Sequence, residues 1–322
     1  MKQTANQHCN TKGILEPIDM GNKVLITGAT GLIGRKLVAE LLAKDYQVAI
    51  LTRSPTEIKN VEVFLWDVKK QQIDNRCLEN VQAIIHLAGA PVIEEKWSPE
   101  RKQEIIDSRV DSTKLLYNTI LDQKKNIVKS FISASAVGFY GDCGDEILTE
   151  ASPSGYGFLA DCCKLWEQAV EEGENLGLRV VKLRTGIVLS MEGGALPSFD
   201  KPVKMCVGSA LGTGKQWTPW IHIDDMVAMY VESLTNHTMS GSYNASAPFP
   251  VTNKEMTRQI AKQLHKPFWP VKVPRSVIEL LMGQRTDAIL MSSNTSAQKI
   301  LDAGFNFKFT RLPEALEALY RL

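Results

Sequence analysis

The chain has 322 residues, of which 44% are hydrophobic, so it is long enough for one large α/β domain with a smaller domain attached. Its formal net charge of +1 at pH 7 gives no electrostatic reason to expect nucleic acid or a membrane surface as a partner. Six cysteines show no C-x-x-C motif and no metal-like spacing with histidine. We therefore expect reduced thiols, no bound metal and a cytoplasmic location. No apolar run approaches the roughly 20 residues of a membrane span.

Strand-like and helix-like segments alternate along the chain. Apolar runs predict strands at 23–27, 47–51, 61–66, 82–87, 128–133 and 178–183. Helical spacing of apolar residues predicts helices after the first strand, at 99–123 and at 159–176. This alternation is typical of an α/β fold, a doubly wound parallel sheet of the Rossmann type, in which ligands bind outside the carboxyl ends of the strands.

The turn between the first strand and the first helix is rich in glycine. Residues 27–34 read TGATGLIG, so Gly28, Gly31 and Gly34 stand at intervals of three. Such glycines allow a tight turn, close approach of a pyrophosphate and close packing of helix on strand, with the phosphates at the helix N-terminus. We therefore predict a dinucleotide site, against the alternative of a glycine-rich turn that binds nothing. The expected cofactor contacts in this turn are Gly28, Thr30, Gly31, Leu32, Ile33 and Gly34.

The end of the second strand indicates which nicotinamide cofactor binds. Arg53 lies nineteen positions beyond Gly34, where an NAD site carries Asp or Glu for the ribose 2′-OH. A guanidinium suits the 2′-phosphate of NADP(H) instead. The alternative is an ordinary surface arginine at a strand end, and Arg35 is a second candidate for the same phosphate.

Domain boundaries follow from these patterns. We expect a flexible N-terminal extension at 1–20 and an NADP-binding Rossmann-type domain at 21–190, to which 215–246 returns. Glycines and prolines loosen the pattern after 190, and amphipathic stretches occur at 253–264, 275–282 and 313–321. Residues 191–214 and 247–322 are therefore expected to form a smaller C-terminal substrate domain. We expect a monomer or homodimer.

Several motifs after the strands resemble a known family. Besides the glycine motif, they are Trp66-Asp67-Val68, HLAGA at 86–90, SASAVGFYG at 133–141 and WIHIDD at 220–225. Over 23–322 the chain resembles the extended short-chain dehydrogenase/reductases, and within them the atypical, epimerase-like branch related to nucleoside-diphosphate-sugar epimerases and cell-division-inhibitor-like proteins. The resemblance implies Asp67 and Val68 at the adenine, and Leu87, Ala88 and Gly89 along the phosphates and nicotinamide ribose. Gly186 and Ile187 are expected at a turn that passes the nicotinamide. For His86, in an apolar strand, a structural role is the better interpretation.

The chain departs from that family at its catalytic positions. A usual member has a tyrosine as acid/base and a lysine four residues later that lowers its pKa. If Glu167 is aligned with the glutamate that usually follows, Leu159 takes the place of the tyrosine and Cys163 that of the lysine. Lys164 comes one residue late and points away. The Tyr-x-x-x-Lys dyad is therefore missing.

Three other polar residues are candidates for chemistry. Ala136 stands at the usual serine, which leaves Ser135 and Ser133 as the nearest hydroxyls. Tyr140 follows the fifth strand, where its phenol fits either a substrate-facing position or the core. Arg109 replaces the usual asparagine of the long helix. Its fixed fork of donors suits either an anionic substrate or a cofactor phosphate, and the sequence leaves both open. Ser135, Tyr140 and Arg109 are the predicted catalytic residues.

Three functions fit these observations. The first is an NADP(H)-dependent oxidoreductase or epimerase-like enzyme with a non-standard proton donor and a small-molecule substrate. The second is a non-catalytic protein that uses NADP occupancy to regulate a partner. The third, a fold kept for interaction alone, is disfavoured because folding does not require an anion site.

Overall fold

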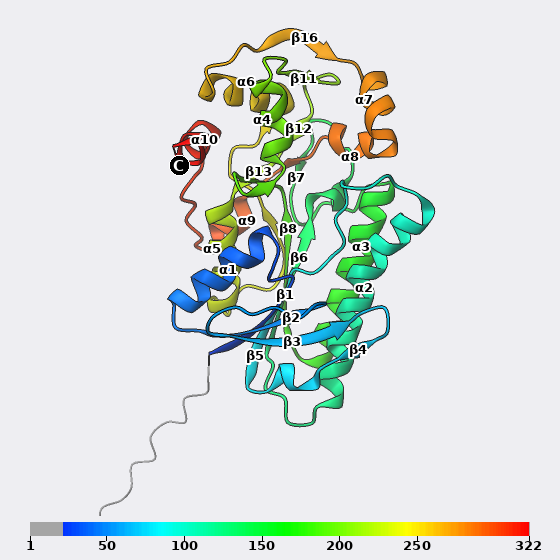
Figure 1. The fold of residues 1–322 in the computed structure, drawn as a ribbon, viewed down its shortest axis with the longest axis vertical. Coiled ribbons are helices and arrows are strands. Elements are labelled where there is room, and N and C mark those ends of the chain that lie inside the picture. Colours follow the sequence, from blue (N-terminus) through cyan, green and yellow to red (C-terminus); the bar gives the residue numbers. More distant parts are fainter. Residues whose placement is uncertain (1–21, 322) are drawn as a thin grey trace, which may run out of the picture.

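The computed structural model describes residues 22–321, so the extension expected at 1–20 lies outside the described residues. A central sheet of eight strands runs through the larger part of the molecule (Figure 1), in the order β14-β8-β6-β5-β1-β2-β3-β4. Its strands are β1 (Lys23–Thr27), β2 (Gln47–Thr52), β3 (Val61–Asp67), β4 (Gln72–Ile73), β5 (Val81–His86), β6 (Ser130–Ala136), β8 (Arg179–Thr185) and β14 (Gly241–Ala245). All neighbours pair in parallel except β3 and β4. The predicted doubly wound Rossmann-type fold is confirmed.

Helices cover both faces of this sheet. Helices α1 (Leu32–Ala43) and α5 (Ile223–Thr235) pack together on one face, and α2 (Pro99–Asp122) and α3 (Phe158–Glu171) on the other. Because the strands are buried from both sides, their apolar residues alternate between two cores. Val24 and Ile26 of β1 face Leu37 and Met226, whereas Leu25 belongs to the opposite core.

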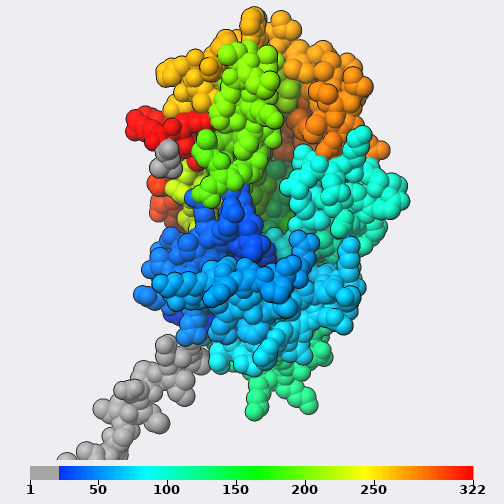
Figure 2. All heavy atoms as spheres, in the orientation of Figure 1, coloured from blue at the N-terminus to red at the C-terminus, as the bar shows by residue number. Residues whose placement is uncertain are grey.

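A smaller unit, which we call the C-terminal lobe, lies at the carboxyl end of the sheet (Figure 1). It has its own core, in which α4, α6 and α10 pack through residues such as Leu196, Met256 and Leu316. Its elements are α4 (Leu196–Lys204), β11 (Ser209–Leu211), α6 (Asn253–Gln263), β16 (Trp269–Val273), α7 (Arg275–Met282), α8 (Thr286–Leu290) and α10 (Leu312–Tyr320). Figure 2 shows the surface hollowed between α4 and the segment that follows β5.

Short elements complete the fold. They are β7 (Ile147–Leu148), β9 (Ile187–Ser190), β10 (Gly193–Gly194), β12 (Trp217–Thr218), β13 (Trp220–His222), β15 (Val251–Thr252), β17 (Asn294–Thr295), α9 (Gln298–Asp302) and 3-10 turns at Asn75–Leu78, Val137–Tyr140, Glu172–Leu176 and Gly283–Arg285.

Two boundaries differ from the expected ones. Residues 294–305 were expected in the C-terminal domain, but Ile300 and Phe305 pack into the sheet core beside α5, and β17 pairs with β7. A short apolar pattern does not reveal which of two cores it enters, which explains the difference. In addition, β6 continues to Ala136 rather than ending at 133, so Ser135 lies within a strand and not after it.

Candidate cofactor-binding site

The three glycines of the 27–34 turn face different surroundings. Gly28 has a φ of +68°, and a Cβ on it would lie 2.8 Å from the carbonyl carbon of Leu87. A Cβ on Gly34 would lie 2.4 Å from the carbonyl oxygen of Gly28. Gly31 is exposed, and its Cβ would meet only that same oxygen, at 3.3 Å. The fold itself therefore requires Gly28 and Gly34, whereas the absence of a side chain at Gly31 leaves open surface for a ligand.

The N-terminus of α1 begins at this open surface. Gly31 is the N-cap and provides no side-chain hydrogen bond, and the first turn of α1 has no acidic residue. The first N–H groups of a helix need acceptors from outside it, and the helix dipole favours an anion there. Thr30 is exposed beside this end, and Leu32 and Ile33 are partly exposed. The arrangement fits the pyrophosphate of a dinucleotide.

Thr27 joins the ends of β1 and β5. Its Oγ1 accepts hydrogen bonds from the N–H groups of Leu87 and Ala88, both at 3.2 Å, and lies 2.7 Å from Nδ1 of His86. Nε2 of His86 is 3.0 Å from Oγ of Ser112 on α2. Burial, together with the charge of Arg109, lowers the pKa of His86 to about 3, so the ring is neutral. The structural role predicted for His86 is confirmed, because its ring bonds to Thr27 and Ser112, and Thr27 in turn holds the start of the 87–89 segment in place.

The strand ends beside β1 carry the candidates for the adenosine half of a cofactor. Arg53 is exposed after β2, and no carboxylate in the described part of the chain forms an ion pair with it. Arg35, the second candidate, already lies 3.8 Å from the carboxylate of Glu192. Asp67, at the end of β3, accepts the N–H of Lys70, which lowers the pKa of its carboxyl group. Of the two candidate arginines, both among the described residues, Arg53 is thus the one without a carboxylate partner.

Arg109 reaches the loop that follows β5. Its Nη1 donates to the carbonyl of Ile105 at 2.8 Å and its Nη2 to that of Ala90 at 3.1 Å. The guanidinium lies 5.0 Å from the Trp166 ring, and a Cβ on Gly89 would come within 3.0 Å of its Cζ. Burial lowers the pKa of Arg109, and none of the described carboxylates pairs with it. A largely buried cation without a counter-ion favours the approach of an anion at this end of the site.

Ser135 and Tyr140 lie in a buried polar network. Ser135 is 3% exposed and donates to Glu167 at 2.6 Å. Tyr140 is fully buried; its hydroxyl donates to Asn244 at 2.7 Å and accepts a bond from Arg184 at 2.9 Å. Burial raises the pKa of Tyr140 to about 12, against the opposing charge of Arg184. Of the two placements that the sequence left open for Tyr140, the structure has the one in the core, because β6 continues through Ser135 and the next turn carries Tyr140 inward.

Leu159 and Cys163, the two positions at which the sequence alignment places the tyrosine and lysine of the dyad, lie beside the turn that follows β6. A Cβ on Gly138 would lie 3.4 Å from Leu159 and 3.7 Å from the thiol of Cys163, so these side chains share one face of α3. Lys164 is exposed, in agreement with the helical spacing. Burial raises the pKa of Cys163, which keeps the thiol protonated. Neither side chain can act as a proton donor near neutral pH.

Gly186 and Ile187 join β8 to β9. A Cβ on Gly186 would lie 2.7 Å from the carbonyl oxygen of Pro219, and the N–H of Ile187 donates to that oxygen at 2.7 Å. Gly186 is thus required by packing between the link and the 219–220 segment. The backbone here lies at the carboxyl end of β8, as expected for a turn that passes a ligand.

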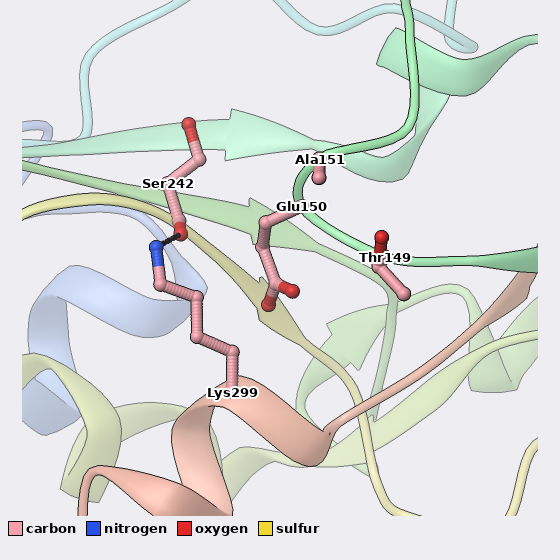
Figure 3. A pocket seen from close by; sticks show the side chains of 5 residues that line it. All are labelled: Thr149, Glu150, Ala151, Ser242 and Lys299. Atoms are coloured by element: carbon pink, nitrogen blue, oxygen red, sulfur yellow. Dashed lines mark hydrogen bonds between the residues drawn. The ribbon is translucent and has the colours of Figure 1, made fainter.

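A cavity of about 400 Å³ lies elsewhere, at the outer edge of β14 (Figure 3). It is lined by Thr149, Glu150, Ala151, Ser242 and Lys299. Lys299 donates to the carbonyl of Ser242 at 2.7 Å, and Glu150 accepts the N–H of Asn244 at 2.7 Å. Side chains thus satisfy the free edge of the last strand, which protects it from pairing with another chain. This cavity lies four strands from β1 and its glycine turn.

Among residues 22–321, no helix combines the length and the apolar composition needed to cross a membrane. Within the same range, no three His, Cys, Asp or Glu side chains are grouped as metal ligands.

Sequence reasoning missed Thr27, Glu167 and Arg184 as organisers of the site. For Glu167 and Arg184 the available signal was a charged residue on the buried face of a helix or within an apolar strand, whereas Thr27 is the first residue of the glycine motif itself.

Comparison with known proteins agrees with this geometry. The profile of the NAD dependent epimerase/dehydratase family matches residues 24–246, and a domain of unknown function, DUF1731, matches 273–319. An epimerase family protein of Arabidopsis thaliana, the chloroplastic SDR39U1 homolog, is 35% identical over 304 residues, covering 92% of this chain and 86% of that protein. Epimerase family protein SAR0825 of Staphylococcus aureus is 35% identical over 298 residues, covering 92% and 98%.

Solved structures show the same fold. The human epimerase family protein SDR39U1, determined with NADPH, superposes with a TM-score of 0.82 at 24% identity, covering 93% of this chain and 99% of that one. A nucleoside-diphosphate sugar epimerase of Corynebacterium glutamicum gives 0.75 at 34% identity, covering 92% of this chain and 58% of that one. UDP-glucose 4-epimerase of Thermus thermophilus, determined with NAD, gives 0.74 at 20% identity, covering 93% and 98%.

Proposed function

The chain belongs to the NAD dependent epimerase/dehydratase family, and we propose that it is an NADP(H)-binding, oxidoreductase- or epimerase-like protein of the atypical extended short-chain dehydrogenase type. The observation that carries this proposal is the open surface at Gly31, next to the uncapped N-terminus of α1. Packing requires a glycine less strictly there than at Gly34, because a Cβ would meet a single backbone oxygen, at 3.3 Å rather than 2.4 Å. A dinucleotide pyrophosphate explains both the glycine and the uncapped helix.

Arg53 supports NADP(H) over NAD(H). Its exposed guanidinium has no carboxylate partner among the described residues, whereas Arg35 is already next to Glu192. A 2′-phosphate would supply the missing partner for Arg53. Among the structural neighbours, the human protein was determined with NADPH and the Thermus epimerase with NAD, so the choice for this chain depends on its own residues.

The residues of this chain would bind and orient the reactants more than they would move protons. A bound nicotinamide supplies hydride transfer. Leu159 and Cys163 provide no acid or base near neutral pH, and Arg109 provides a fixed cation at the loop after β5. We propose that Arg109 contacts either an anionic group of a small-molecule substrate or a phosphate of the cofactor.

A second candidate function is a regulatory protein that binds NADP(H) without turnover. The buried bonds of Ser135 and Tyr140 favour it, because both hydroxyls are occupied by Glu167, Asn244 and Arg184. The five cysteines of the described range are free thiols, which supports the cytoplasmic location proposed for either function.

Calorimetric titration of the purified protein with NADPH and with NADH tests the proposal. We expect saturation by NADPH with one site per chain and a weaker response to NADH. A flat titration with both cofactors would contradict nicotinamide binding. Tight NADPH binding without turnover of any carbonyl, alcohol or sugar-nucleotide substrate would favour the regulatory function.

A further inference from the structure

The loop at residues 89–95, directly after β5, is held in an unusual way. It has no regular secondary structure, and its carbonyl groups accept no backbone hydrogen bonds within the described chain. Four consecutive carbonyls instead each accept a bond from a side chain. The pairs are Ala90 with Arg109 at 3.1 Å, Pro91 with Arg101 at 2.7 Å, Val92 with Trp97 at 2.7 Å and Ile93 with Arg285 at 2.7 Å.

Three of these donors belong to the Rossmann-type part, on α2 or just before it. The fourth, Arg285, comes from the C-terminal lobe, 192 residues away along the chain from Ile93. Its Nε also donates to the carbonyl of Met282 at 3.1 Å, which fixes the guanidinium to the turn before α8. The side chain of Arg285 therefore joins the lobe to the loop by bonding to the backbone on both sides.

The surroundings of Arg285 distinguish it from a surface cation. Arg285 is 9% exposed, and no described carboxylate pairs with it. In the same lobe, Arg275 is exposed and forms ion pairs with Glu279 and Asp287. A buried guanidinium that bonds only to carbonyl oxygens is costly to leave unpaired, so the loop and the lobe hold each other in register.

A second contact lies beside the first. Ala288 of α8 packs against the apolar cluster of Trp97, Ile105 and Cys162, which supports the loop from below. The lobe therefore contacts the loop itself through the hydrogen bond of Arg285, and it contacts the apolar cluster beside the loop through Ala288. Movement of α8 would disturb both contacts together.

The other end of the loop reaches the candidate cofactor site. Gly89 follows Leu87 and Ala88, whose N–H groups bond to Thr27, and it lies under the guanidinium of Arg109. A ligand that orders residues 87–89 would therefore order a loop whose far end is fixed to the C-terminal lobe. Two sites that bias one structural element are energetically coupled, and the coupling is reciprocal.

We propose that Arg285 is a positioning residue that couples NADP(H) binding to the placement of the C-terminal lobe. This inference depends on the proposed cofactor binding. Cofactor occupancy stabilises the docked lobe, and the docked lobe raises affinity for the cofactor. Loss of the Arg285 bond to Ile93 uncouples the two without removing any group from the glycine turn or from Arg53.

The test compares Arg285→Met with the control Arg258→Met, an exposed arginine of α6 that pairs with Glu255 of the same helix, by NADPH fluorescence titration and by amide hydrogen exchange with and without NADPH. In the unmutated protein and the control, we expect NADPH to slow exchange at 27–34, at 89–95 and at 286–290. In Arg285→Met, slowing at 27–34 remains, slowing at 286–290 disappears, and affinity falls on the order of tenfold. Arg285→Lys should recover part of the affinity, because an ammonium can reach one carbonyl.

The outcomes separate the two proposals. If NADPH fails to saturate even the unmutated protein, the proposed function is wrong. If NADPH binds but leaves exchange at 286–290 of the unmutated protein unchanged, the coupling is wrong. If Arg285 has a merely structural role, Arg285→Met will unfold at a lower temperature but will keep the NADPH affinity and the exchange pattern of the unmutated protein. That result would also overturn the coupling.

Discussion

Arg184 and Glu167 form a buried ion pair in which Nε and Nη2 of the guanidinium each donate to a carboxylate oxygen at 2.8 Å. The pair joins β8 to α3 across one face of the sheet. Ser135 and Ser242 donate to the same carboxylate, at 2.6 and 3.2 Å. Glu167 accepts the bond of Ser135 and Arg184 donates to Tyr140, which explains why both hydroxyls face inward.

Removal of one partner of this pair should strongly destabilise the fold. We expect Glu167→Gln to lower the free energy of unfolding at pH 7 by about 3–5 kcal/mol, because it leaves the Arg184 guanidinium buried without a counter-ion. Urea unfolding followed by circular dichroism measures the change. Glu174→Gln, at an exposed position, is the control and should change stability little.

The same variant has a defined pH dependence. Burial alone would raise the pKa of Glu167, but the bonds and charge of Arg184 outweigh it and the pKa lies below its ordinary value of 4.5. The carboxylate therefore stabilises the folded state above pH 4.5, and this contribution is lost as pH falls through the lowered pKa. The stability difference between the unmutated protein and Glu167→Gln should shrink below pH 4.5. A difference that stays constant down to pH 3 would show that the charge of Glu167 is not the cause.

Arg53 should decide cofactor preference. Arg53→Asp should weaken NADPH binding by roughly 1.5–3 kcal/mol, about ten- to hundredfold, because a charge-assisted contact with the 2′-phosphate is lost. NADH binding should be unchanged or improved. Arg35→Ala serves as the matched control, since Arg35 already lies next to Glu192. Equal affinity of the unmutated protein for NADPH and NADH would defeat the assignment.

The glycines should separate binding from folding. Gly31→Val should abolish NADPH binding in a folded protein, because its side chain would occupy open surface needed by the pyrophosphate. Gly34→Ala should instead destabilise the protein, because its Cβ would lie 2.4 Å from the Gly28 carbonyl oxygen. Thermal unfolding and NADPH titration on both variants measure the two effects. Full binding by Gly31→Val would place the phosphates elsewhere.

Turnover should be slow and should depend on Arg109. With no phenol and ammonium at Leu159 and Cys163, a gain of about 10² to 10⁴ from positioned proton transfer is missing. A panel of carbonyl, alcohol and sugar-nucleotide substrates, followed at 340 nm with NADP(H), gives the rates. We expect Arg109→Met to remove residual activity, whereas Ser135→Ala should act through stability by releasing Glu167. Brisk turnover untouched by Arg109→Met would show that the reacting centre lies elsewhere.

The sequence by itself determined the fold class and most of the elements. Strands at 23–27, 47–52 and 61–67 were predicted to within one residue, because buried parallel strands are continuous apolar runs. The predicted strands also directed attention to Gly28, Gly31 and Arg53, because these residues closely follow the first and second strands. Local spacing also placed Leu159 and Cys163 on one helical face.

Only the tertiary structure decided what the polar side chains do. Sequence spacing does not show that Ser135 bonds to Glu167, or that the hydroxyl of Tyr140 bonds to Asn244 and Arg184. The assignment of 294–305 to the sheet core and the bond from Arg285 to Ile93 likewise depend on contacts between distant segments. Local patterns specify elements and their apolar faces, whereas hydrogen-bond partners and close approaches are set by which elements the completed fold brings together.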